Sequence, residues 1–348
     1  MKKNKIVSGL LVVLLVMLSF SVVAFADEHV KPENVVALAQ GVEGEFTILE
    51  DALIEAGLVD ALTDPEAEFT VFAPTDAAFE KLLGDYGLTA EELLASGELL
   101  KNVLLYHVVS GTVMSSDLID GPVETLLEEN IIIDAGNFKV NDSNILVDDK
   151  LFDLEADNGV VHVIDQVLLP EEWFEQYDSI VEIAIADENF SILVEALTKA
   201  ELVSVLEGGP FTVFAPTNDA FAALLEDLDL TKEELLELDN LADILLYHVV
   251  PVRAFASDLS DGQTLPTALD SASLTVSISN GTVNINESEV TAANIVASNG
   301  VIHVLDAVLI PEEEEEDMDD AWGDIGMLPY IFVGALGVSG LVVMKKRK

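Results

Sequence analysis

The chain contains no cysteine, so disulfide bonds, thiol chemistry and cysteine-ligated metals are all excluded. Its stability must therefore come from ordinary apolar cores and hydrogen bonds. Cations are also scarce, because 15 Lys and Arg residues stand against 65 Asp and Glu residues. Seven of these cations lie in residues 1–26 and 345–348, which leaves eight cations and all 65 carboxylates in residues 27–324.

The resulting formal charge of −57 on residues 27–324 limits what this segment can bind. It repels nucleic acid and anionic lipid, so neither is expected as a partner. Salt screens such self-repulsion, which favours adaptation to a saline medium; binding of divalent cations is the alternative. Calcium needs oxygen ligands at fixed spacing, and no Asp-x-Asp-x-Asp-Gly loop occurs. We expect diffuse association of divalent cations and no bound cofactor.

The two ends of the chain predict export and anchoring. Residues 1–26 combine three lysines, an apolar run and a small-residue pattern, which is the layout of a secretory signal peptide. Residues 325–344 form an uncharged apolar segment of a length that can cross a bilayer. The basic residues 345–348 would then stay on the cytoplasmic side. We expect a single-pass protein of the cell membrane with its ectodomain outside; the alternative is a removable sorting tail.

The ectodomain consists of two copies of one unit. The phrase FTVFAPTDAAF at 69–79 returns as FTVFAPTNDAF at 211–221, an offset of 142 residues, and further blocks match at offsets of 141 to 144. This period is far too long for a solenoid and indicates a duplicated domain. We predict domains at 32–171 and 178–312, with 313–324 as an acidic spacer before the membrane.

Local patterns place the secondary structure of each copy. Apolar spacing predicts an amphipathic helix over 46–62, and FTVFAP predicts a buried strand that ends at Pro74 or Pro216. The next two residues can cap a new helix. An antiparallel β region with Asn-Gly turns then follows, so each copy reads as helices first and strands later. A scaffold role is expected for Thr70, Pro74, Thr75, Asp76, Thr212, Pro216, Thr217 and Asn218.

Four of the five histidines lie in the repeated blocks: His107, His162, His248 and His303. One hypothesis pairs two imidazoles of each copy, with Asp165 or Asp306 nearby, as metal ligands. The alternative is a half-buried strand histidine that hydrogen-bonds to backbone or to a hydroxyl. Each histidine lies in an apolar run and no third ligand recurs, so the structural interpretation is favoured and no metal is expected.

Signals of catalysis are missing. The sequence has no Gly-x-Ser-x-Gly elbow and no phosphate-binding glycine loop. Carboxylates are so abundant that any pair could be chosen as acid and base, so they carry no information. We therefore predict a protein that is not an enzyme. Four Asn-x-Ser/Thr triplets are either glycan acceptors or chance matches: Asn141, Asn189, Asn280 and Asn286.

Three ordered motifs, TVFAPT(D/N), the Tyr-His block and the closing NGV(V/I)HV(I/L)D, resemble the fasciclin domain, present here twice. The resemblance covers nearly all of the ectodomain. It implies an α+β fold in which each domain is a wedge-like β-sandwich with a helical layer. It also implies adhesion or binding at cell surfaces and matrices without enzymatic activity.

The resemblance also implies candidate contact residues. The family's Tyr-His motif matches Tyr106-His107 and Tyr247-His248. The adhesive Asp-Ile pair of animal relatives falls on Asp153-Leu154 in the first copy. In the second copy it falls on Asn294-Ile295, which lacks the carboxylate.

These observations predict a surface protein that mediates cell–cell, cell–matrix or biofilm contacts. Its partner would be a surface or matrix protein or a polysaccharide. Two alternatives stay open. The first is a carrier that holds a small apolar ligand or a carbohydrate between helix layer and sheet, and the second is a structural component of the envelope.

Overall fold

The computed structural model describes residues 31–42, 44–147 and 152–311. The predicted signal peptide, acidic spacer, membrane segment and basic tail lie outside the described residues. Among the helices that the structure describes, none has the length and apolar character needed to cross a bilayer.

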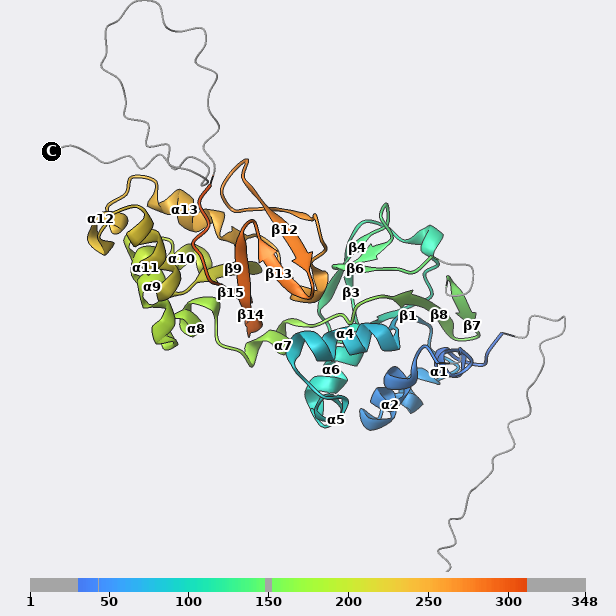
Figure 1. Cartoon of the computed structure of the whole chain (residues 1–348). Coiled ribbons are helices and arrows are strands. Elements are labelled where there is room, and N and C mark those ends of the chain that lie inside the picture. The colour runs from blue at the N-terminus through green and yellow to red at the C-terminus, as the bar shows by residue number, and fades with distance from the viewer. Residues whose placement is uncertain (1–30, 43, 148–151, 312–348) are drawn as a thin grey trace, which may run out of the picture.

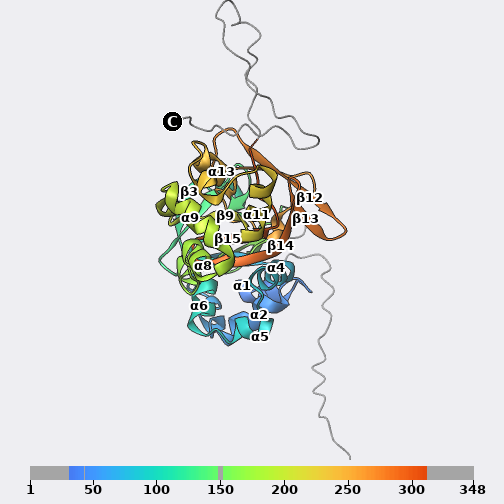
Figure 2. The same ribbon diagram turned by 60° about the vertical axis from the view of Figure 1, so that its left-hand side comes forward.

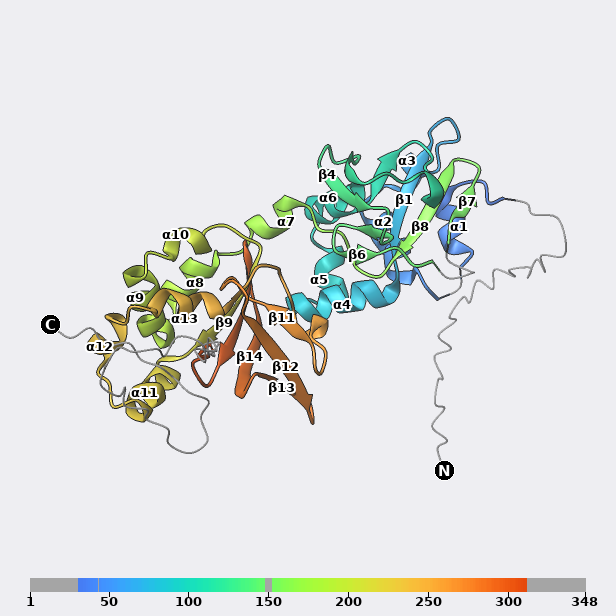
Figure 3. The same cartoon turned by 90° about the horizontal axis from the view of Figure 1, so that it is seen from above.

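The chain folds into an N-terminal module (33–177), which includes helix α7 (Glu171–Glu175), and a C-terminal module (179–309). Figure 1 and Figure 3 show α7 between the bodies of the two modules. The helices of the N-terminal module are α1 (Val35–Gln40), α2 (Thr47–Glu55), α3 (Val59–Leu62), α4 (Asp76–Tyr86), α5 (Ala90–Leu94), α6 (Glu98–Tyr106) and the 3-10 turn η1 (Ser115–Asp117). Its strands are β1 (Phe69–Pro74), β2 (Val108–Ser110), β3 (Gly121–Glu124), β4 (Asn130–Asp134), β5 (Lys139–Val140), β6 (Ser143–Asn144), β7 (Leu154–Ala156) and β8 (Gly159–Ile164).

The C-terminal module repeats this order. Its helices are α8 (Ile180–Ala186), α9 (Ser191–Lys199), α10 (Val203–Leu206), α11 (Asn218–Asp227), α12 (Lys232–Leu236) and α13 (Leu241–Tyr247), with 3-10 turns η2 (Glu188–Phe190) and η3 (Ala256–Asp258). Its strands are β9 (Phe211–Pro216), β10 (Val249–Val250), β11 (Thr264–Pro266), β12 (Ser273–Ser279), β13 (Thr282–Ile285), β14 (Ser288–Ala297) and β15 (Gly300–Leu305). The mixed helix and sheet content that the sequence predicts is confirmed.

The strands that follow the helices pair antiparallel with one another, as predicted, but each module also contains one parallel pair that was not predicted. In the N-terminal module the order β2-β1-β8-β7 places β1 and β8 side by side and parallel, and β3-β4-β5-β6 forms a second sheet. In the C-terminal module one sheet runs β10-β9-β15-β14-β13-β12-β11, and β9 and β15 are again parallel. In each module the strand that directly precedes α4 or α11 pairs with the last strand of the module, and such a parallel pair requires a long crossover.

The central pair of strands is packed so closely that glycine is required at its start. Gly159 lies opposite Phe69, and a Cβ added there would lie 2.1 Å from the Phe69 carbonyl oxygen. Gly300 repeats this with a distance of 2.0 Å to the carbonyl oxygen of Phe211. The Asn-Gly pairs of the sequence therefore provide both the turn and the space for the pairing.

Each module has one core on either face of this central pair. In β1, Phe69 and Ala73 pack under the helices, whereas Phe72 faces a second cluster with Ile131 and Ile133 of β4. The C-terminal module has two corresponding clusters, one with α9 and one with β12. No cluster mixes core residues of the two modules, so in the described chain each module has its own cores.

The predicted helix over 46–62 is divided in the structure. Helix α2 ends at Glu55, and Gly57 takes a left-handed backbone conformation with φ +67° before α3 begins. The predicted strands that end at Pro74 and Pro216 are confirmed. Capping boxes at Thr89 and Thr231 open α5 and α12.

Candidate functional site

The repeated TVFAPT(D/N) phrase forms a corner between a strand and a helix. The Thr75 hydroxyl accepts a hydrogen bond from the Ala78 amide at 3.2 Å and caps α4. The Asp76 carboxylate accepts a hydrogen bond from the Ile48 amide at 2.8 Å, which fixes the start of α2 beside α4. These contacts hold scaffold elements together.

The second copy makes the same contacts with slightly different chemistry. Thr217 caps α11 through the Ala220 amide, and the Asn218 side-chain oxygen accepts a hydrogen bond from the Ile192 amide at 3.0 Å. Asp and Asn are therefore interchangeable here, because the corner needs an acceptor oxygen and no charge. In both copies a buried threonine joins β1 or β9 to the loop after the neighbouring strand, β2 or β10. Thr70 donates to the Gly111 carbonyl, and Thr212 donates to the Val252 carbonyl.

The Tyr-His motif is buried at the end of a helix, which corrects the expectation of half-buried strand histidines. His107 is the C-cap residue of α6, and it is 2% exposed to solvent. Its Nδ1–H donates to the Val103 carbonyl at 2.7 Å, and its Nε2 accepts from the Leu168 amide at 2.8 Å. Burial lowers the pKa of His107 to about 4, against the opposing effect of the bond to Val103. The ring is therefore neutral at pH 7 and joins α6 to the segment after β8.

His248 has the same arrangement in the second copy. Its Nδ1–H donates to the Ile244 carbonyl, its Nε2 accepts from the Leu309 amide, and burial lowers its pKa to about 4. Because both ring nitrogens of His107 and of His248 hold backbone groups, neither ring has a free lone pair for a metal.

The tyrosines of the motif reveal partners that sequence reasoning missed. The Tyr106 hydroxyl donates to the Asn130 carbonyl and accepts from the Asn141 side-chain amide. Tyr247 makes the corresponding bonds to the Ser273 carbonyl and the Asn286 amide. The sequence signal for this pairing is the matched VNDS and INES segments of the two copies. Two of the four predicted glycan acceptors thus use their amide nitrogens inside the fold.

His162 and His303 lie in the central strands β8 and β15 and are fully buried, again in contrast to the half-buried expectation. Each Nε2–H donates to a backbone carbonyl at 2.9 Å, of Val113 and Ala254 respectively. Burial lowers both pKa values. Among the described residues, no group of three or more His, Asp or Glu side chains is placed to hold a metal ion.

In both copies, the first residue of the Asp-Ile position forms hydrogen bonds within its own module. Asp153 has φ +46°, and its carboxylate accepts hydrogen bonds from the Ser115 amide and hydroxyl at 3.0 and 2.7 Å. Its Oδ1 also lies 3.3 Å from Nδ1 of His162, without hydrogen-bonding geometry. Asn294 has φ +58° and accepts from the Ala256 amide at 2.8 Å. Both residues therefore support a left-handed turn and hold η1 or η3 in place.

The residues that follow Asp153 and Asn294, and the aspartates considered as metal ligands, also make contacts inside their own modules. Leu154 and Ile295 pack against the helix-side cores of their modules. Asp165 accepts from the Ser143 hydroxyl and the Asn144 amide, and Asp306 makes the same two contacts in the second copy. Neither aspartate is available as a metal ligand beside a histidine.

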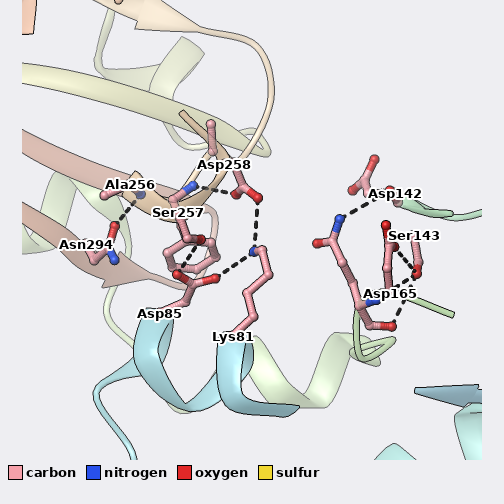
Figure 4. A network of polar contacts seen from close by, with 12 residues as sticks. Lys81, Asp85, Asp142, Ser143, Asp165, Ala256, Ser257, Asp258 and Asn294 are labelled. Carbon is pink, nitrogen blue, oxygen red and sulfur yellow. Dashed lines mark hydrogen bonds and ion pairs between the residues drawn. The ribbon is translucent and has the colours of Figure 1, made fainter. Parts of the chain in front are cut away.

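A contact between the two modules was not predicted. Helix α4 packs against η3 and β14 of the C-terminal module, and Figure 2 shows β14 beside α4. Lys81 of α4 forms ion pairs with Asp85 at 2.8 Å and with Asp258 at 3.0 Å, and the Ser257 hydroxyl donates to Asp85 at 2.7 Å (Figure 4). Next to this network the rings of Tyr86 and Phe255 lie 5.1 Å apart.

A cavity of about 720 Å³ lies along this contact. Its walls come from α4, the β5–β6 turn and α7 on one side, and from the segment after β10 and the β14–β15 turn on the other. By contrast, the apolar pocket between helix layer and sheet in the C-terminal module, lined by Phe190 and Ile302, has a volume of only about 10 Å³. The space between the modules is the larger of the two by far.

The fasciclin domain model matches residues 44–170 and 188–311. The chain belongs to the fasciclin domain family. The chain is similar to protein sll1483 of Synechocystis, with 47% identity over 38% of this chain and 73% of that protein. It is also similar to the transforming growth factor-beta-induced protein ig-h3 of Sus scrofa, with 29% identity over 83% of this chain.

The match spans 40% of the ig-h3 protein, and a match to human periostin (29% identity, 72% of this chain) spans 29% of periostin. A solved fasciclin domain pair from the insect cell adhesion molecule fasciclin I aligns with 76% of this chain and 96% of that structure, with 19% identity and a TM-score of 0.37. The two matched regions agree with the tandem duplication in the sequence. Membership in this family fits a non-enzymatic protein at the level of the family.

Proposed function

We propose that this protein is a non-enzymatic adhesin that mediates cell–cell, cell–matrix or biofilm contacts. Its partner would be a surface or matrix protein or a polysaccharide. Residues 325–344 would hold it in the membrane, and the two modules would lie outside the cell. The family, which has adhesion-related members at cell surfaces, supports a role of this general kind.

One observation carries the proposal. The polar side chains of the repeated motifs, including Tyr106, His107 and Asp153, are engaged in hydrogen bonds inside their own module. A group that already holds the scaffold is poorly placed to bind a partner or to carry out chemistry. Contact with a partner must therefore come from other groups on the exterior.

The N-terminal module offers exposed aromatic side chains for such a contact. Phe138 and Phe152 are each 37% exposed, and their rings lie 6.2 Å apart in an edge-to-face arrangement. Val283 and Ala293 occupy the matched places of the second copy. Exposed aromatic side chains are typical anchors of interfaces. This pair favours the N-terminal module as the one that contacts a partner.

The proposal can be tested by display of the full chain on a host cell that does not adhere. We expect displaying cells to attach to a layer of the native host and its matrix. The double substitution Phe138→Ser and Phe152→Ser should reduce attachment several-fold. Ile185→Ser, which removes an exposed apolar side chain of the C-terminal module, is the matched control. Equal attachment by displaying and non-displaying cells would refute the proposal.

The alternative function, a carrier that holds its ligand between the helix layer and the sheet, is less well supported. A pocket for a ligand of drug size has a volume of about 300–1,000 Å³. The space between helix layer and sheet of the C-terminal module has room for about one water molecule.

A further inference from the structure

We propose that the contact between the two modules is a salt-sensitive hinge, which is closed at high ionic strength and open at low ionic strength. This conformational change is separate from the adhesive function proposed above and does not depend on it. Three features of the described chain carry the inference: the like charges of the two modules, the cations at their contact and the separate core of each module.

Both modules are strongly acidic, so they repel each other over long distances. Residues 33–177 carry 32 carboxylates and four cations, a formal charge of −28. Residues 179–309 carry 21 carboxylates and three cations, a formal charge of −18. Such repulsion reaches about 30 Å at 0.01 M salt but only about 3 Å at 1 M. The modules therefore repel each other strongly in dilute salt and hardly at all in molar salt.

Two cations hold the modules together at short range. Lys81 lies 3.0 Å from Asp258 of the other module, and the Arg253 guanidinium stacks at 3.8 Å on the Phe174 ring of α7. The side chains of Lys81 and Asp258 are only 25% and 29% exposed. Salt screens a partly buried pair at contact distance much less than it screens exposed charges far apart. Added salt therefore removes the repulsion between the modules and largely retains this attraction.

The two modules can separate without loss of their cores. No hydrophobic cluster of the described chain mixes core residues of both modules, and the cavity of about 720 Å³ interrupts the packing along their contact. Tyr177 packs on the N-terminal core and Ser179 caps α8, so a single residue, Asp178, joins the two modules. A rotation about Asp178 would part α4 from η3 and leave both folds intact.

Comparison of the two copies indicates that the contact residues serve the contact and not the fold. At the position matched to Lys81 the second copy has Ala223, and at the position matched to Arg253 the first copy has Thr112. Each module thus folds without the cation at the matched place. Two of the seven cations in the modules lie where two acidic bodies meet, which is where they oppose the repulsion most effectively.

The hinge is tested by single-molecule energy transfer in the full chain. Because the chain has no cysteine, Ala77→Cys on α4 and Ser260→Cys just after η3 introduce one label in each module, both at exposed positions beside the contact. We expect one narrow population of high transfer efficiency at about 1 M NaCl and a broad population of lower efficiency at about 0.01 M. Circular dichroism should stay constant over this range, because both modules remain folded.

Two pairs of variants separate the contact from the net charge. Lys81→Met should need several-fold more salt to close the hinge, whereas Lys101→Met, an equal charge change at an exposed pair, should not. Asp258→Asn lowers the repulsion but removes the carboxylate that faces Lys81, so it too should need more salt. It keeps an acceptor for the Phe255 amide. Asp261→Asn, the same charge change at an exposed position, should close at equal or lower salt.

Three results would overturn the proposal. The first is a transfer efficiency that is the same at about 0.01 M and about 1 M NaCl. The second is closure of Lys81→Met and Lys101→Met at the same salt concentration, because the contact would then contribute nothing. The third is a loss of circular dichroism that accompanies the loss of energy transfer, because the modules would then be unfolding and not separating.

Discussion

Lys81 of the N-terminal module and Asp258 of the C-terminal module form an ion pair across the contact between the modules, with 3.0 Å between Nζ and Oδ1. Lys81 also neutralises Asp85, which is 5% exposed. In a chain with so few cations, this one lysine compensates two carboxylates where the modules meet. The contact is therefore a specific feature of this tandem pair.

The first prediction concerns Lys81→Met. This change removes the cation between two aspartates and leaves Asp85 buried with only the Ser257 hydroxyl as a partner. Breaking a buried pair on one side typically costs about 3–5 kcal/mol, and partial exposure of Lys81 places the expected loss near the lower end. We expect calorimetry to resolve two unfolding transitions in the variant. Lys101→Met, at an exposed pair with Glu98, should change stability by less than about 1 kcal/mol.

The second prediction concerns pH. Burial lowers the pKa of His107 and His248 to about 4, whereas an unfolded histidine has a pKa of about 6.5. Below pH 6.5 the unfolded state therefore binds more protons, and stability falls as the pH drops from 6.5 towards 4. Each ring should contribute on the order of 3 kcal/mol to this loss. The pKa values of His162 and His303 are lowered in the same direction.

Urea unfolding of the full chain at pH 7.5 and pH 5 measures this effect. We expect a lower midpoint at pH 5. A midpoint that is constant or higher at pH 5 would mean that the histidines titrate in the folded state as they do in the unfolded chain.

The third prediction concerns the central strands. Gly159→Ala would place a Cβ 2.1 Å from the Phe69 carbonyl oxygen, and neither backbone can move without loss of the β1–β8 pairing. We expect destabilisation of at least about 4 kcal/mol, seen as loss of the cooperative transition of the N-terminal module by circular dichroism. Gly136→Ala is the control, because its Cβ would meet only the Asp134 side chain at 3.6 Å. If Gly159→Ala and Gly136→Ala were similarly stable, this result would contradict the register of the β1–β8 pair.

The sequence predicted these elements unevenly, and the reason is the range of the interactions. Strand β1 and the corner at Thr75 follow from local patterns and were predicted correctly. The parallel pairing of β1 with β8 depends on residues about ninety positions apart, and no local pattern encodes it. The break at Gly57 was missed because apolar spacing continues through it.

The candidate site was predicted less well than the fold. The Tyr-His motif was located, but its burial and its asparagine partner arise from tertiary packing. The contact between the modules involves residues at which the two copies differ, such as Tyr86 and Arg253, so the search for repeated motifs passed over them. Differences between the copies were the signal that could have found this contact.

The fourth prediction concerns salt. A charge of −57 on residues 27–324 opposes the compact state, and salt shortens the range of this repulsion from about 30 Å at 0.01 M to about 3 Å at 1 M. We expect the midpoint of thermal unfolding to rise substantially from low to molar NaCl. Most of this rise should be complete once the screening length is short. A flat dependence would count against adaptation to a saline medium.

The account's central claim is that partners are bound by exterior groups and not by the internally bonded motif residues. The direct measurement is the fraction of cells that stay attached under an applied force, with equal amounts of each variant displayed on the cells. Asp153→Asn copies the side chain of Asn294 and keeps an acceptor for the Ser115 amide, so attachment should equal that of the unsubstituted chain. Phe138→Ser with Phe152→Ser should reduce attachment several-fold. The opposite pattern, in which Asp153→Asn abolishes attachment and the phenylalanine substitutions leave it intact, would contradict the claim.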